Sequence, residues 1–98
     1  MSNPAYNHGQ VTGTGSAITV ASEKVGFRPK RVRLTNLTSR VALEWDDSMA
    51  DASAIKTAAN GDRTVVTSAA ITPTASGFTV GTDSINASGE IILFEAWG

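Results

Sequence analysis

Hydrophobic and polar residues alternate along much of the chain, the pattern of strands with one buried face. In residues 31–36 (RVRLTN), Val32 and Leu34 alternate with arginine and threonine, and residues 41–46 (VALEWD) alternate in the same way. The sequence NLTSR between them has the residue types of a turn. We therefore predict a hairpin.

One register of this hairpin satisfies both of its faces. Apolar side chains then meet on one face and opposite charges meet on the other, which specifies the pairing. A slip of one residue would set Arg33 opposite an apolar side chain. The predicted register pairs Val32 with Trp45, Leu34 with Leu43, Arg31 with Asp46, and Arg33 with Glu44.

Other segments complete an all-β pattern. Residues 47–60 are the only helix candidate, and their apolar positions keep no 3.6-residue period, so we expect one short turn there. About seven or eight short strands separated by turn residues are typical of a sandwich or a small barrel. The further strands are predicted at 17–21 (AITVA), around Ile55, 63–68 (RTVVTS), 70–74 (AITPT), 76–82 (SGFTVGT) and 90–97 (EIILFEAW).

Residues 1–16 and the final strand both point beyond a simple monomer. Residues 1–16 carry no charged side chain, and they are read either as an extended arm ordered against a partner or as a frayed terminus. In the final strand, apolar residues occur on both faces. The core of a single domain can cover only one of these two alternating sets of side chains. The other set needs a second subunit, the chain's own arm, or a helix or loop laid over it. We predict Ile91, Leu93 and Trp97 as a subunit interface.

Composition argues against most chemistry. The 98 residues include no cysteine and one histidine, His8, so a Cys/His dyad is impossible and a Ser-His-Asp triad would rest on His8 alone. We expect no catalytic residues, no cofactor and no metal. The net charge of −1 disfavours nucleic-acid binding as the main role. We also expect no membrane span and no signal peptide, because no apolar run is long enough.

Charges are polarised along the chain. Six of the eight Lys and Arg residues fall between residues 24 and 40, and four of the nine acids fall between 44 and 51. A salt-bridged sheet face explains part of this pattern, and complementary patches on neighbouring subunits or an acidic partner explain it as well. A nucleic-acid patch ranks last, since interleaved aromatic residues are lacking apart from Phe27. The acidic cluster EWDDSMAD does not have the spacing of an EF-hand and reads as a solvated face.

Three groups of residues resemble small structural proteins of tailed bacteriophages. The closing segment has the G-F-x-[VL]-G strand, the Asn- and Gly-containing loop and the final aromatic-alanine strand of those proteins. The matching residues are Gly77, Phe78, Val80, Gly81, Asn86, Gly89, Phe94 and Ala96, then Phe27, Pro29 and Val32 upstream, and Trp45, Asp46, Asp47 and Met49 after the second hairpin strand. The resemblance covers roughly residues 25 to 98.

The resemblance implies a virion component, and the short single domain favours a capsid decoration (cement) protein. Such a protein is a non-enzymatic β-sandwich of jelly-roll type (17–98) with an N-terminal arm (1–16). It is made in the bacterial cytoplasm and sits on the capsid surface. It binds across junctions of the major capsid protein, here as a homo-oligomer, with a trimer expected, and it contacts neither nucleic acid nor membrane. The expected capsid contacts are Tyr6, His8, Arg28, Lys30 and Arg31.

Two alternatives stay open. One is a carbohydrate- or receptor-binding module of a tail tip or fibre, which would use Trp45, Trp97 and the acidic loop. The expected lack of an attachment segment counts against it. The other is a head-tail connector component, which differs in copy number per particle.

Overall fold

The computed structural model describes residues 5–20 and 24–98, and this part of the chain is all-β, as the sequence predicts. A short 3-10 turn, η1 (Ser84–Asn86), is its one helical element. No helix in these two ranges has the length and apolar character needed to cross a membrane. The strands are β1 (Tyr6–Thr12), β2 (Ile18–Val20), β3 (Arg31–Asn36), β4 (Ala42–Asp46), β5 (Ser53–Thr57), β6 (Arg63–Pro73), β7 (Phe78–Val80) and β8 (Ile91–Trp97).

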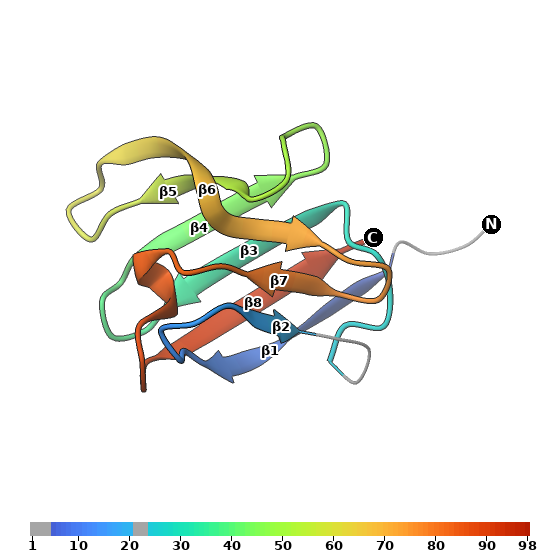
Figure 1. The fold of residues 1–98 in the computed structure, drawn as a ribbon, viewed down its shortest axis with the longest axis horizontal. Helices are drawn as coiled ribbons and strands as arrows, with labels where there is room; N and C mark the ends of the chain where they lie inside the picture. Colours follow the sequence, from blue (N-terminus) through green and yellow to red (C-terminus); the bar gives the residue numbers. More distant parts are fainter. Residues whose placement is uncertain (1–4, 21–23) are drawn as a thin grey trace.

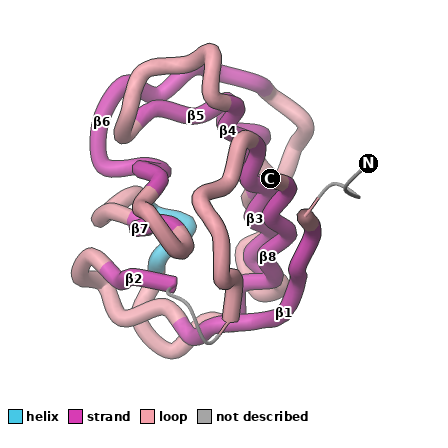
Figure 2. The backbone as a smooth tube through the Cα atoms, turned by 90° about the vertical axis from the view of Figure 1, so that its right-hand side faces the viewer, coloured by secondary structure: helices cyan, strands magenta, loops and turns pink. Residues whose placement is uncertain are grey.

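All eight strands belong to one antiparallel sheet in the order β1-β8-β3-β4-β5-β6-β7-β2. The sheet rolls on itself, so that β1, β8, β3 and β4 form one layer, and β7 and β2 lie across the interior from it (Figures 1 and 2). Its two edge strands, β1 and β2, are consecutive in the sequence and are joined by a short loop. The result is nearly a barrel.

Strand β6 carries the sheet from one layer to the other. Its first residues pair with β5 and its last residues pair with β7. Ala69 has a φ of 61°, and the β5–β6 register shifts between Ser53 and Ala54. Such irregularities bend and twist a strand. The segments predicted as two strands, 63–68 and 70–74, are therefore one bent strand.

The strand order does not give the expected jelly roll. A jelly roll contains two Greek keys, whereas β3 to β7 pair in consecutive order as a meander. Alternation assigns each residue to a face of the sheet but does not say which strands are neighbours. The sequence pattern therefore could not distinguish a jelly roll from a meander. The predicted register of the β3–β4 hairpin, in contrast, is confirmed at all four pairs.

Much of the expected N-terminal arm is part of the sheet. Tyr6–Thr12 pairs with β8 along its whole length, while residues 1–4 lie outside the described residues. Gly9 faces inward and allows Phe94 to pack directly beneath β1, since a Cβ at Gly9 would lie 3.0 Å from the ring. The segment shows little apolar alternation because most of its side chains are exposed at the sheet edge.

The core fills the space between the layers. Phe78 of β7 and Phe94 of β8 meet edge to face, with their ring centroids 5.8 Å apart, a favourable aromatic geometry. On β8, one alternating set is buried, namely Ile92, Phe94 and Ala96. The last strand therefore leaves its second apolar set, Ile91 and Leu93, outside the core.

A buried amide closes the rolled sheet at one end. Asn86 Nδ2 donates to the carbonyls of Ser16 (2.6 Å) and Gly81 (2.9 Å), and its Oδ1 accepts from the Thr14 N–H (2.9 Å). The Thr14 and Ser16 groups belong to the β1–β2 loop, and Gly81 follows β7. One side chain thus joins the connection between the two sheet edges to the segment that leads into η1.

Replacing this amide should destabilise the fold. Asn86→Ala leaves three partly buried backbone groups without their partner, so we expect the free energy of unfolding to fall by about 1–3 kcal/mol. Urea denaturation followed by circular dichroism measures the change. Asn60→Ala, at an exposed turn, is the matched control and should cost less than about 1 kcal/mol. Equal losses in both variants would contradict this role of Asn86.

Candidate functional site

The side chains that point away from the core on β1, β8, β3 and β4 form one broad surface, called the outer face here. It lies on the far side of the molecule in Figure 1. The registers align its residues in three rows that cross the strands in the order β1, β8, β3, β4. The rows are Tyr6–Trp97–Arg31–Asp46, His8–Glu95–Arg33–Glu44 and Gln10–Leu93–Thr35–Ala42.

Aromatic side chains occupy one corner of the outer face. The Tyr6 ring lies 5.5 Å from the Trp97 ring and 5.7 Å from the His8 ring, measured between centroids. The Arg31 guanidinium carbon lies 5.5 Å from the Trp97 ring centroid, within reach of a cation–π interaction. The Tyr6 hydroxyl donates to Glu95 Oε2 at 3.0 Å.

The ion pairs of the outer face differ from those that the hairpin register implied. Arg31 Nη2 lies 3.4 Å from Glu44 Oε2, and Arg63 Nη2 lies 3.5 Å from Glu44 Oε1. Asp46 instead accepts hydrogen bonds from the hydroxyl and the backbone N–H of Ser48. These two bonds, helped by the charge of Arg31, lower the pKa of Asp46. Long arginine side chains reach diagonal partners, so register alone does not fix the pairs.

Arg33 has a different position from Arg31 and Arg63. It stands directly between Glu95 and Glu44 in its row, yet within residues 5–20 and 24–98 it makes no ion pair. Its side chain lines an open hollow of about 200 Å³ together with Tyr6 and His8. A guanidinium in this position is available to a carboxylate that approaches from outside.

Exposed hydrophobic side chains gather on the same side. Ile91 and Leu93 belong to the outer face, and Leu37 extends β3 beside Ile91, whose carbonyl accepts from the Leu37 N–H at 2.9 Å. Val65 pairs with Ile55, which pairs with Glu44. In the described part of the chain the exposed large hydrophobic side chains are Tyr6 (47%), Leu37 (52%), Val65 (67%), Ile91 (39%) and Leu93 (40%). Four of these side chains lie on the outer face or at its edge, whereas Val65 lies on β6, beyond β4 and β5 in the strand order.

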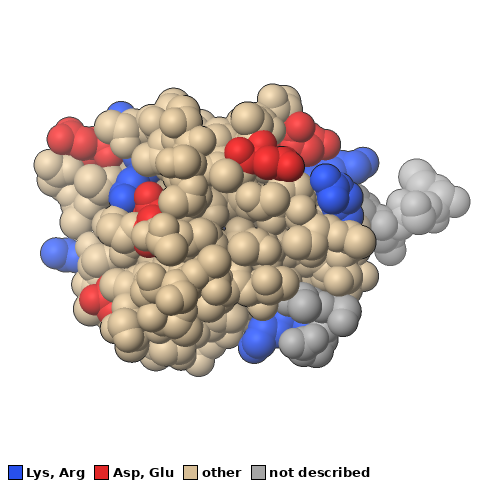
Figure 3. All heavy atoms as spheres, in the orientation of Figure 1, with Lys and Arg blue, Asp and Glu red and all other residues tan. Residues whose placement is uncertain are grey.

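The opposite side of the molecule differs in character. Figure 3 views it over β2, β7 and the end of β6, where charged side chains lie mainly around the margin. Threonines of neighbouring strands meet there, and the Thr19 and Thr79 hydroxyls are 3.3 Å apart. The apolar and charged groups suited to a protein contact are thus concentrated on the outer face.

The structure regroups the residues predicted from sequence. Two sets predicted for different surfaces, the capsid contacts Tyr6, His8 and Arg31 and the subunit contacts Ile91, Leu93 and Trp97, share the outer face. Glu95 and Arg33 at its centre are not among the contact residues predicted from sequence, although Arg33 belongs to the predicted hairpin. The alternation along β8 places Glu95 among its outward residues. Knowing in addition that β8 lies between β1 and β3 would have identified both residues.

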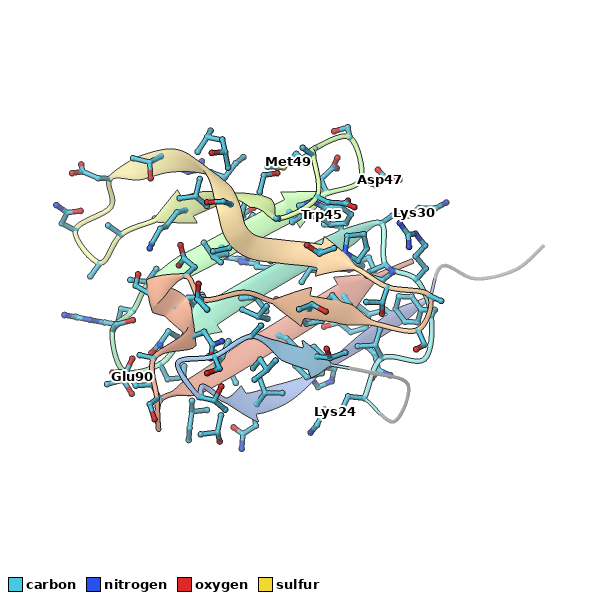
Figure 4. The ribbon with its side chains drawn as sticks, viewed as in Figure 1. Lys24, Lys30, Trp45, Asp47, Met49 and Glu90 are labelled. Carbon is cyan, nitrogen blue, oxygen red and sulfur yellow. The ribbon has the colours of Figure 1, made fainter. Side chains whose placement is uncertain are left out.

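Arg28 and Lys30 lie elsewhere, at one end of the sheet. They line a hollow of about 340 Å³ with Asp47 and Asp51, and the side chains of Lys30 and Asp47 are near each other at this end (Figure 4). The predicted basic patch is therefore a surface of mixed charge.

Trp45 is not available as a sugar-stacking platform. Its side chain is 2% exposed, and its Nε1–H donates to the Ala50 carbonyl at 3.2 Å. The alternation of residues 41–46 already placed Trp45 on the apolar face of the hairpin. The expectation that Trp45 contacts a ligand is wrong for this reason.

Within the described ranges, no group of three or more His, Asp or Glu side chains is placed to hold a metal ion. Comparison with known proteins finds no match, since no protein-family model, curated protein or solved structure is significantly similar to this chain.

The Tyr6 hydroxyl reports on the electrostatics of the outer face. Partial desolvation, the hydrogen bond to Glu95 and the charge of Glu95 all raise the pKa of Tyr6. Glu95→Gln removes the charge, so we expect the pKa of Tyr6 to fall. Tyr6 is the only tyrosine, and ultraviolet absorbance of the phenolate therefore measures it alone. Asp51→Asn, in another part of the surface, should leave the titration unchanged. An unaltered Tyr6 pKa in Glu95→Gln would contradict this coupling.

Proposed function

We propose that this chain is a structural protein of a tailed-phage particle, which decorates and stabilises the capsid by binding across junctions of the major capsid protein. The observation that carries the proposal is the outer face. Exposed hydrophobic side chains and charges of both signs on one broad sheet face suit contact with another protein surface. The hollow beside Arg33 is open and has a volume of about 200 Å³, below the range of about 300–1,000 Å³ that is usual for small-molecule pockets.

The residues of the phage resemblance support this proposal through their structural roles. Phe78 and Phe94 form the aromatic centre of the core, and Asn86 closes the rolled sheet. At Gly81 a Cβ would lie 2.5 Å from the Ala69 carbonyl oxygen, so that only glycine fits there. These residues have structural roles in the scaffold, which suits a virion component.

The mechanism would be mechanical. A protein that binds only the assembled capsid stabilises the assembled form by mass action. Repeated over many junctions, a modest contact per copy gives a large total effect. Two surfaces are candidates for the capsid contact: the outer face with Tyr6, His8 and Arg31, and the end that carries Arg28 and Lys30. Deleting residues 1–16 would not separate these surfaces, because it removes strand β1.

The location of the protein tests the proposal directly. Mass spectrometry of purified heads and tails should find this protein in heads, at a copy number on the order of hundreds, as multivalent decoration requires. A location in tails would favour the receptor-binding alternative. A copy number of about a dozen or fewer would favour a connector component. Either result would overturn the decoration proposal.

A charge reversal tests the capsid contact at the end of the sheet. Lys30→Glu should weaken binding to purified heads by about tenfold, because it adds a negative charge beside Asp47 and Asp51 and removes a cation that faces the partner. Lys24→Glu is the matched control, since Lys24 is exposed in another part of the surface (Figure 4). Cosedimentation with heads measures both affinities. Equal binding by the two variants would place the contact elsewhere.

A further inference from the structure

The charges of the outer face balance each other. Three arginines and three acids lie on it or reach it, so its formal charge is zero. They are Arg31, Arg33 and Arg63 against Glu44, Asp46 and Glu95. A neutral face that carries both signs, together with exposed hydrophobic groups, can associate with an identical face, because charges of one copy can meet opposite charges of the other.

The order of the strands defines how two such faces would match. β8 and β3 are neighbours, β1 flanks β8, and β4 flanks β3. Consider a two-fold axis in the plane between two stacked faces, running along the boundary of β8 and β3. This axis sets β8 of one copy over β3 of the other, and β1 over β4. Because the axis runs parallel to the strands, each row of one copy lies over the same row of the other copy.

In this arrangement no residue of an outer-face row meets a like charge. At the centre, Glu95 of each copy meets Arg33 of the other copy, and by symmetry this contact occurs twice. The Arg33 guanidinium, which has no ion-pair partner in the described part of one chain, thereby gains a carboxylate. The remaining matches are Trp97 with Arg31, Tyr6 with Asp46, His8 with Glu44, Leu93 with Thr35, and Ile91 with Leu37.

Neighbouring axes give poor matches. An axis along β3 would set Glu95 over Glu44 of the second copy, and an axis along β8 would set Glu95 over itself. Both place like charges together, which disfavours an interface. Among these three axes parallel to the strands, the charge pattern therefore favours the boundary between β8 and β3.

We propose that the outer face is covered by a second copy of this chain, stacked face to face about this axis. Facing sheets pack about 10 Å apart with their strands rotated by about 30°, so the match is best near the axis, where Glu95 and Arg33 lie. The hydrophobic side chains Ile91, Leu93 and Leu37 then lose solvent contact, which supplies the apolar part of the association.

The pairing rests only on this chain's own residues, and it makes the outer face unavailable to the capsid. It predicts a two-fold dimer in place of the expected trimer. It also leaves Arg28 and Lys30, at the end of the sheet, free for a different partner.

Two charge reversals and their mixture test the dimer. Glu95→Arg and Arg33→Glu each place like charges opposite one another at two sites, so each should weaken self-association at least about tenfold. An equimolar mixture restores opposite charges at both sites, because each substituted position then faces the other substituted position and the two unchanged residues face each other. We expect the mixture to form a heterodimer although neither variant dimerises alone. Sedimentation equilibrium and native mass spectrometry measure these states.

Two charge reversals away from the outer face serve as matched controls. Arg28→Glu and Asp51→Arg change residues at the end of the sheet, and both should dimerise like the original chain. Recovery in the mixture also excludes misfolding as the cause of the single-variant losses. A monomeric or trimeric original chain, single variants that dimerise normally, or a mixture that stays monomeric would each overturn the proposal, whatever the location of the protein in the particle.

Discussion

The fold depends on one buried amide that joins segments distant in the sequence. Asn86 binds Ser16, Thr14 and Gly81, and the strands attached to these residues are the first, second and seventh along the chain. A rolled sheet with two edges needs a link across its open side, and here that link is polar. A buried amide is favourable only when its donors and acceptors are satisfied. The geometry of this end is therefore tightly specified, and with it the placement of β1 beside β8.

The placement of β8 gives the outer face its composition. β8 lies between β1 and β3, so its outward side chains form the middle of a broad surface. Because the hydrophobic residues of β8 are not confined to one face, the sheet presents apolar groups to solvent beside a row of alternating charges. Neither property alone would indicate a binding surface, since scattered exposed hydrophobic residues are common. Their coincidence on one face is what supports a protein contact.

Part of this architecture can be predicted from the sequence. The β3–β4 register follows from requiring one pairing to satisfy apolar and charged residues together. Strand β1 escapes prediction because an edge strand with exposed side chains shows little alternation, and its apolar support comes from β8. The bend of β6 escapes it because Ala69 adopts a positive φ that alanine does not signal as glycine would. The outer face is formed only when β1 pairs with β8. Its residues can therefore be identified one by one from the sequence, but the sequence does not show that they share one surface.

The position of β8 also constrains how the molecule folds. Strands β3 to β7 form a meander whose contacts join segments close in sequence, and such contacts form quickly because the loops to be closed are short. β1, in contrast, pairs only with β8, which comes last among the described strands. β1 must therefore wait until all the intervening strands and β8 have been synthesised before its partner exists. Folding during translation can produce the meander early, while completion of the sheet is a late event after β8 has left the ribosome.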